Sequence, residues 1–357
     1  MGDLVELGRV HVDSSRRRVV GVGLFSVALA IPGWSDVVGR AQALQADPLA
    51  RIGQAEVDSV IAVTDWLSEI DHTFGGHHAR PMANAFLTET VAPYLRATAP
   101  EPVRKSMLTA AAMACYLTGW MAMDEGLHGI AQRYHLEGLE LAGAADNRTT
   151  YGHILRGMSV HAAQVGHGPA ATQYANAAAD SIPSPGPRMK AFVAGQQAHG
   201  YALVISSRSA LRSLRETERS LDKVTSGPGN TFGGFSYATL AYATAQVRYA
   251  LGDVKGSVES LEEHFKLRDK TDSRRSGMIF GGLMAERQLE LGHLDAACAT
   301  WGRIFTKYPA TYSDRAAERV RVAKRLLTPH LAHPQARQTH ERARALLAQK
   351  STARPSV

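Results

Sequence analysis

A glycine followed five residues later by a small residue recurs along this chain at nearly constant spacing. The instances are Gly126/Ala131, Gly166/Ala171, Gly252/Ser257 and Gly292/Ala297. The first two glycines are 40 residues apart, as are the last two. The gap of 86 residues between them leaves room for one more unit, whose poorer signature lies at Ser206–Ala210. Self-similarity at such a period is typical of a helical repeat array.

Each repeat unit is expected to be two helices. Glycine adopts the left-handed conformation at a helix end without steric cost, so it is expected to end the first helix. The small residue then lies one turn into the second helix, where a larger side chain would hold the two helices apart. The second helix of the last unit has apolar residues at three- and four-residue steps, namely Leu294, Ala297, Trp301 and Ile304. Pro183 and Pro309 each follow a small position by twelve residues and are expected to stop the second helix.

These patterns predict an all-α, tetratricopeptide-like α-solenoid of about five paired-helix repeats. We divide the chain into an Arg-rich and apolar N-terminal segment (1–35), an N-terminal helical region (36–100), the repeats (101–313) and a basic C-terminal helical cap and tail (314–357). The alternative is an irregular all-α domain with coincidental glycines. A hydrophobic content of 45% supports a core, and Cys115 and Cys298 are expected to be buried thiols.

The net charge of +7 is concentrated at the C-terminus, because residues 314–357 carry ten basic and three acidic residues. Ala316, Val320, Ala323 and Leu327 form one apolar stripe with arginines on the other faces, which predicts a solvated capping helix. Concentrated basic charge also attracts nucleic acid or acidic proteins. The candidate residues for such contacts are Arg319, Arg321, Lys324 and Arg325.

The N-terminus combines arginines with an apolar run. Ser15–Arg18 precedes a run from Val19 to Trp34, an order that resembles a twin-arginine export signal. No small-x-small cleavage site follows promptly, and the run is too short to span a bilayer. We therefore favour a structural segment that covers the open end of the first repeat in a cytoplasmic protein without membrane contact. Tat-dependent export is the alternative.

Three further stretches carry a family resemblance. They are Asp71-His-Thr-Phe-Gly-Gly-His-His-Ala-Arg80, Leu117-Thr-Gly-Trp-Met-Ala-Met-Asp124 and Gly129-Ile-Ala-Gln-Arg-Tyr134. With the Arg-rich segment, they resemble the tetratricopeptide-repeat region of actinobacterial helix-turn-helix transcriptional regulators, over roughly residues 10–310. In such regulators a helix-turn-helix domain precedes the repeats, whereas only about fifteen residues precede the Arg-rich segment. The resemblance implies the sensing and assembly half of a regulator, with DNA contacted only indirectly or through an upstream domain.

The stretch from Asp71 to Arg80 holds the densest group of polar side chains. We expect a turn before a helix at 81–95, with Pro81 in its first turn and Phe74 packed on the core. His78 and Arg80 then lie near a helix N-terminus, where they can contact an anionic ligand. No metal site is expected, because adjacent histidines face different ways on any regular element.

A second candidate site lies in the first full repeat. Trp120 and Asp124 are four residues apart and share a helix face, and Tyr134 belongs to the same repeat. The first helices of such arrays line a concave surface, where an aromatic beside a carboxylate suits a cationic or peptide ligand. The alternative places Trp120 in the core and Asp124 at a turn. His153 and His161 are eight residues apart and are expected on a solvated helix face.

Glycine pairs recur in a similar context. Thr73–Gly76 is repeated at Thr231–Gly234, with a partial copy at Phe280–Gly282. We expect these pairs to allow close approach between helices.

The leading functional prediction is a cytoplasmic regulatory or scaffold protein. It would bind a peptide, a small signal or a partner protein in its concave groove, and homodimerisation is a further option. No GxSxG, HExxH or P-loop motif is present, so neither an enzyme activity nor a cofactor is expected. The alternatives are an exported peptide- or solute-binding protein and an enzyme with its active site in the groove.

Overall fold

The computed structural model describes Leu4, residues 25–26, 47–225, 235–269 and 273–352. The arginines at 16–18 and most of the apolar run at 19–34 lie outside these ranges. Within them the chain is all-α apart from one short pair of strands, and successive helices pack as antiparallel pairs. The predicted paired-helix architecture is therefore confirmed.

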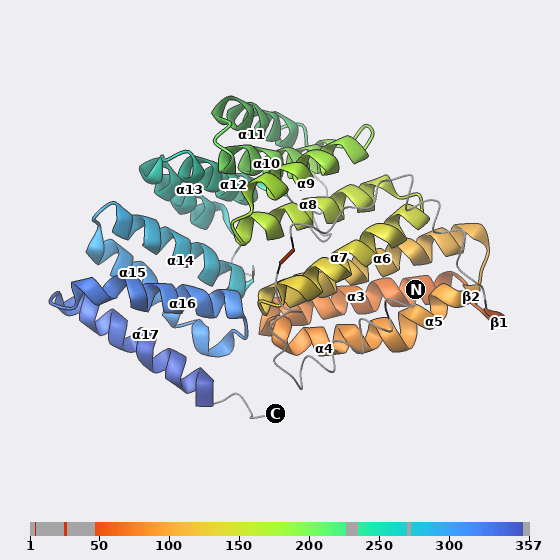
Figure 1. Cartoon of the computed structure of the whole chain (residues 1–357), viewed down its shortest axis with the longest axis horizontal. Helices are drawn as coiled ribbons and strands as arrows, with labels where there is room; N and C mark the ends of the chain where they lie inside the picture. Colours follow the sequence, from red (N-terminus) through yellow and green to blue (C-terminus); the bar gives the residue numbers. More distant parts are fainter. Residues whose placement is uncertain (1–3, 5–24, 27–46, 226–234, 270–272, 353–357) are drawn as a thin grey trace.

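Five helix pairs occupy the predicted repeats. They are α6 (Glu101–Asp124) with α7 (His128–Ala144), α8 (Arg148–Gln164) with α9 (Gly168–Ser181), α10 (Pro187–Leu203) with α11 (Ser207–Leu221), α12 (Tyr237–Ala250) with α13 (Val254–Leu267), and α14 (Arg274–Glu290) with α15 (Leu294–Phe305). Before them lie β1 (Asp47–Arg51), α3 (Gln54–Phe74), α4 (Gly76–Phe86), the π-helical η1 (Leu87–Val91), α5 (Ala92–Arg96) and β2 (Ala97–Thr98). After them lie η2 (Tyr308–Ala310), α16 (Asp314–Leu327), η3 (Thr328–His330) and α17 (Pro334–Thr352). Figure 1 shows the pairs following one another along an arc, with α3 and α4 at one side and α15 to α17 at the other.

The turn inside each repeat contains one left-handed residue. Gly126, Gly166, Gly252 and Gly292 have φ angles between 75° and 88°. A Cβ at any of these glycines would meet nothing within 4 Å, so the backbone conformation rather than space favours glycine there. In the third repeat the same place is taken by Ile205, whose φ is 58°. A left-handed conformation costs an L-residue about 1–2 kcal/mol, so this turn is strained.

The small residues five positions later lie between the paired helices. Ala131, Ala171, Ala210, Ser257 and Ala297 are all 0% exposed. Ser257 also donates a hydrogen bond of 2.7 Å from Oγ to the carbonyl oxygen of Ala245 on the paired helix. A larger side chain at these positions would separate the helices, which explains the pattern in the sequence.

The N-terminal region differs from the prediction in detail. The helix expected at 81–95 begins earlier, because α4 starts at Gly76, directly after α3. Pro81 therefore lies inside this helix and not in its first turn. Gly75, with φ 94°, separates the two helices alone, so no longer turn is needed. The expected packing of Phe74 on the core is wrong, because this side chain is 50% exposed. The parallel pairing of β1 with β2 was not predicted.

Glycine pairs do allow close helix approach. A Cβ at Gly281 in α14 would lie 2.6 Å from Cγ2 of Ile304 in α15. A Cβ at Gly76 would lie 2.7 Å from the carbonyl oxygen of Met121 in α6. The predicted packing role is confirmed for these two copies, while Thr231–Gly234 lies outside the described residues.

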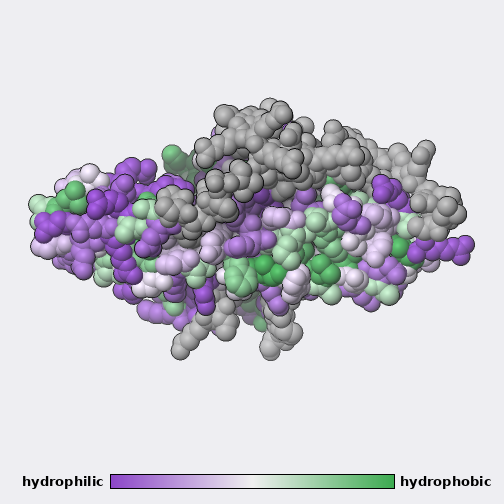
Figure 2. All heavy atoms as spheres, turned by 90° about the horizontal axis from the view of Figure 1, so that it is seen from below, coloured by the Kyte–Doolittle hydropathy of each residue, from purple (hydrophilic) through white to green (hydrophobic). Residues whose placement is uncertain are grey.

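The core is divided along the arc. One large hydrophobic cluster runs through α3 to α10, and a second joins α14 to α17. The predicted apolar stripe of α16 is buried in the second cluster, and Cys115 and Cys298 are buried free thiols as predicted. Seen from below, hydrophobic side chains gather near the middle of the molecule, while the end formed by α15 to α17 is mostly hydrophilic (Figure 2).

Among the described residues, α6 is the one helix that could cross a membrane by length and composition. Of its apolar window, 78% is buried against neighbouring helices. Because α6 packs against α3, α4 and α7, its apolar composition is accounted for by its central place in the core.

Candidate functional site

Two predicted ligand-binding residues lie at the start of α4. Arg80 is buried and forms an ion pair with Glu125, just after α6, in which Nη2 and Oε2 are 2.9 Å apart. Nδ1 of His77 lies 3.1 Å from the same carboxylate. Burial alone would raise the pKa of Glu125, but hydrogen bonds from His77 and Arg80 hold it below its ordinary value. His78 is exposed, with its ring centroid 4.6 Å from that of Tyr312.

Asp124, a third predicted residue, is buried where the two ends of the arc meet. Its carboxylate accepts a hydrogen bond of 2.7 Å from Ser313 and lies 3.4 Å from a guanidinium nitrogen of Arg275 in α14. Arg275 also donates two hydrogen bonds of 2.7 Å to Asp71 in α3. Burial raises the pKa of Asp124, while Arg275 and Arg315 oppose that rise. One arginine thus bridges two buried carboxylates from separate helices.

The backbone completes this contact, which we call the junction (Asp71, Phe74, Asp124, Arg275, Tyr312 and Ser313). The N–H of Tyr312 donates a hydrogen bond of 3.1 Å to the carbonyl oxygen of Phe74. Gly75 has no side chain at the closest approach, where a Cβ would collide with the carbonyl oxygen of Tyr312. The arc therefore closes on itself, and α3 lies beside α14 (Figure 1).

The remaining two predicted residues lie farther inside. Tyr134 is fully buried, donates a hydrogen bond of 2.7 Å to Oδ1 of Asn84, and has its pKa raised by burial. Trp120 is half-buried, edge-on to the ring of Tyr116 at a centroid distance of 6.1 Å. His78, Arg80 and Asp124 thus lie near the junction, and Trp120 and Tyr134 lie in the first repeat. A ligand-binding role for these five residues stays a prediction.

A short piece of chain from far upstream lies against α7. Gln132, 1% exposed, pairs with both backbone groups of Ser26. Its Oε1 accepts a hydrogen bond of 2.7 Å from the Ser26 N–H, and its Nε2 donates one of 2.8 Å to the Ser26 carbonyl oxygen. Figure 1 shows this piece in red near the middle of the arc, beside α8. The N-terminal segment was expected at the open end of the first repeat, whereas these two residues lie inside the arc.

Phe25 lies between two histidines. Its ring is edge-on to His161 and stacked on His167, with centroid distances of 5.0 Å in both cases. Nε2 of His161 lies 3.0 Å from Nδ1 of His128, so one of these nitrogens carries the hydrogen and the other accepts it. We call the surface formed by His128, Gln132, His161 and His167 the inward site.

Burial favours the neutral form of two imidazoles in and around the inward site, those of His135 and His161. Burial lowers the pKa of His135 to about 4, and it lowers that of His161 further, with help from His135, His128 and Arg315. Both nitrogens of His135 and Nδ1 of His161 lack a hydrogen-bond partner within the described ranges. The prediction that His153 and His161 face solvent is wrong, because α8 is enclosed by α6, α7, α9 and α10.

The predicted basic contact residues lie on α16. Arg319 forms an ion pair of 3.0 Å with Glu286, and Arg321 forms one of 3.1 Å with Glu318. The other two candidates, Lys324 and Arg325, form no ion pair with any residue that the structure describes. A contact between this helix and nucleic acid or an acidic protein stays a prediction.

A second basic surface was missed from the sequence. Four exposed arginines line α11, namely Arg208, Arg212, Arg215 and Arg219. Because Glu216 and Glu218 lie between them, the net charge of the helix is small and gave no signal. Their spacing of four, three and four residues places them on one helix face, and this spacing could have revealed the surface.

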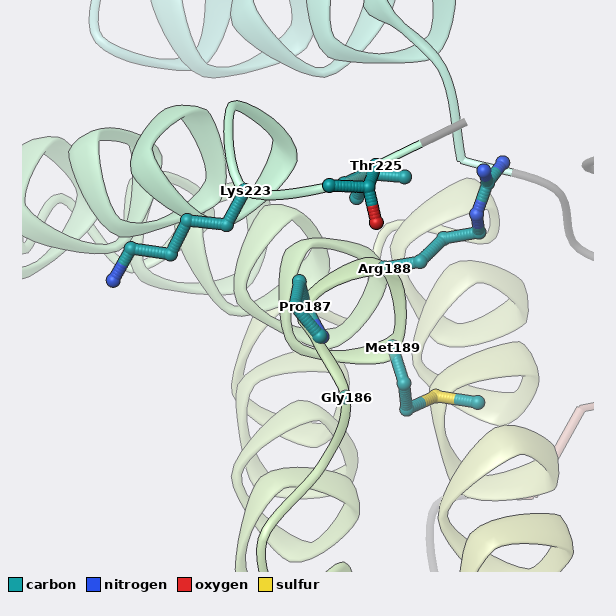
Figure 3. A pocket seen from close by; sticks show the side chains of 7 residues that line it. Gly186, Pro187, Arg188, Met189, Lys223 and Thr225 are labelled. Carbon is teal, nitrogen blue, oxygen red and sulfur yellow. The ribbon is translucent and has the colours of Figure 1, made fainter. Parts of the chain in front are cut away.

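A surface pocket of about 330 Å³ lies where α10 begins and α11 ends. It is lined by Gly186, Pro187, Arg188, Met189, Lys223, Val224 and Thr225. Figure 3 shows that the side chains of Arg188 and Lys223 point away from each other. No set of polar groups converges in this pocket, so it is a weaker candidate than the inward site.

Sequence reasoning also missed Gln132, His167 and Arg275. Their partners are distant along the chain, because Gln132 and Ser26 are 106 positions apart and Arg275 and Asp71 are 204 positions apart. The one local signal was Gln132 itself, a long polar side chain next to the small residue that faces the paired helix.

Comparison with known proteins adds no family. No protein-family model matches the chain, and no curated protein matches it. Among the described residues, no group of three histidine, cysteine or acidic side chains could hold a metal ion. The function is therefore inferred from the geometry of the inward site.

Proposed function

We propose that this chain is a regulatory binding module whose inward site takes an extended peptide segment. The observation that carries the proposal is the pairing of Gln132 with both backbone groups of Ser26, at 2.7 and 2.8 Å. A surface that holds two residues of its own chain in this way has the donor and the acceptor needed to hold another peptide.

The chemistry of Gln132 suits this role. A primary amide offers a donor and an acceptor side by side, which matches the N–H and C=O of one peptide residue. Hydrogen bonds to the main chain give affinity for any extended peptide, and neighbouring pockets then select side chains. Because Gln132 is buried, an empty site would leave its polar atoms to water or unpaired, which favours an occupied site.

We also propose the type of repeat and the regulatory role. The left-handed turn residue and the buried small residue in each pair support a tetratricopeptide-like solenoid. The resemblance to repeat regions of helix-turn-helix regulators supports a role in transcriptional regulation in the cytoplasm. Peptide binding would then alter the array, and any effect on DNA would pass through another domain or a partner protein.

The proposal can be tested with a labelled peptide and the full chain. The probe is the decapeptide Gly-Val-Gly-Leu-Phe-Ser-Val-Ala-Leu-Ala, the sequence of residues 21–30, with a fluorophore and two added lysines for solubility. Fluorescence anisotropy measures its dissociation constant with the wild type and with Gln132→Ala. Two lost hydrogen bonds weaken the isolated site about tenfold to a hundredfold. Because Ser26 of the chain itself loses the same hydrogen bonds and competes less, the measured affinity should fall by less, about two- to tenfold.

Gln164→Ala is the matched control, because Gln164 is an exposed glutamine on α8. It should leave the dissociation constant unchanged. Equal binding by the wild type and Gln132→Ala would place the peptide elsewhere and refute the proposed site. No binding by any folded variant would refute the proposed function.

A further inference from the structure

We propose that the inward site contains an aromatic subsite between His161 and His167, and that it selects peptides with an aromatic residue directly before the residue clamped by Gln132. The inference rests on the proposed function and adds the ligand class. Phe25–Ser26 is then a resident copy of the ligand, carried by the chain itself.

The geometry supports an aromatic side chain at this place. Phe25 meets the face of His167 at an interplanar angle of 19° and the edge of His161 at 79°. Stacked and edge-to-face contacts use the quadrupole of an aromatic ring, which an aliphatic side chain lacks. Ser26, whose backbone Gln132 binds, follows Phe25 directly in sequence. The aromatic subsite and Gln132 therefore contact neighbouring residues of the peptide.

The state of the histidines supports the same ligand class. Burial lowers the pKa of His161, so at neutral pH its ring is an uncharged aromatic partner. His135, His128 and Arg315 lower this pKa further. A cationic peptide side chain would be repelled by these positive or hydrogen-donating neighbours, whereas an uncharged aromatic ring would not.

The resident copy has a thermodynamic consequence. A tethered segment acts at an effective concentration on the order of 1 mM. If the isolated site binds such a sequence with a dissociation constant of about 100 µM, the resident copy weakens a competing peptide about tenfold. A partner peptide must therefore displace Phe25, and weakening the resident copy should strengthen binding of the partner.

The experiment uses the full chain and three labelled decapeptides. They have the sequence of residues 21–30 with Phe, Leu or Ala at the aromatic position. We expect the Phe peptide to bind at least about tenfold more tightly than the Ala peptide, with the Leu peptide between them. In the Phe25→Ala protein all three peptides should bind more tightly than to the wild type.

The chain offers a matched pair of protein variants. His167 and His293 both follow the turn glycine of a repeat and occupy the N-cap of the second helix. In the Phe25→Ala protein, where the resident phenylalanine no longer competes, His167→Ala should weaken the Phe peptide about two- to tenfold and leave the Ala peptide unchanged. His293→Ala should change neither, because no part of the inward site includes it.

The outcomes separate this inference from the proposed function. Binding that depends on Gln132 but shows no preference for Phe over Leu, and no gain in Phe25→Ala, would overturn the subsite and leave the peptide site intact. Binding that ignores Gln132 would overturn both. A preference for Phe that survives His167→Ala would place the aromatic subsite elsewhere.

Discussion

Replacing Arg275 by methionine tests the junction that closes the arc. Methionine keeps much of the length of the side chain and removes its charge and all its hydrogen bonds. The carboxylates of Asp71 and Asp124 then lose their shared cation, although their side chains are only 3% and 1% exposed. The substitution therefore leaves two like charges buried near each other.

The expected cost follows from this burial. Removing one partner of a buried ion pair typically costs about 3–5 kcal/mol. The side chain of Arg275 is 13% exposed, so some solvent reaches the site and we expect about 3 kcal/mol. Because the junction joins the two ends of the arc, part of this energy can be released by opening, with a larger radius of gyration.

Urea unfolding followed by circular dichroism measures the change in the free energy of unfolding, and small-angle X-ray scattering measures the opening. Arg321→Met is the control, because Arg321 and its partner Glu318 are 45% and 44% exposed. This substitution should cost less than about 0.5 kcal/mol. Adding Asp71→Asn to Arg275→Met should recover part of the loss. A loss below about 1 kcal/mol for Arg275→Met, with unchanged scattering, would refute the reasoning.

Three further predictions concern the repeats themselves. Burial and nearby Arg156 lower the pKa of His153 to about 4, so between about pH 6.5 and 4 the unfolded chain binds a proton that the folded chain does not. As the pH falls through that range, the folded state should lose stability, by up to about 1.4 kcal/mol per pH unit from this residue. His153→Gln should reduce the slope of the free energy of unfolding against pH, measured in urea. Gly281→Ala should destabilise by about 1–3 kcal/mol through overpacking, whereas Gly302→Ala, with open space around it, should stabilise by about 0.5–1 kcal/mol in thermal unfolding. Ile205→Gly should raise the melting temperature, because it removes left-handed strain from a residue that is 78% exposed, and a lower value would show that Ile205 makes a favourable contact.

The repeats could be predicted because their causes are local. A left-handed turn selects Gly126 and its counterparts, and close packing selects Ala131 and its counterparts within the same helix pair. Both constraints act over fewer than ten residues and leave a periodic mark on the sequence. Ile205 shows the limit of the pattern, because the turn forms there without the favoured residue.

The sites could not be predicted in the same way. The sequence pointed to Asp124 and Arg80 as chemically unusual, and both are buried side chains that lie in ion pairs. Their surroundings depend on closure of the arc, which brings α14 to α3 and has no local signature in the sequence. The inward site depends in turn on Phe25, which meets α8 across more than a hundred residues.

Photo-crosslinking tests the central claim most directly. The labelled decapeptide would carry benzoylphenylalanine in place of its phenylalanine, and irradiation with the full chain would be followed by mass spectrometry of the digested adduct. The account predicts adducts on α8 and at the start of α9, near His161 and His167, that disappear with excess unlabelled peptide. Adducts concentrated on α10 and α11 around the surface pocket, or spread without competition, would contradict it.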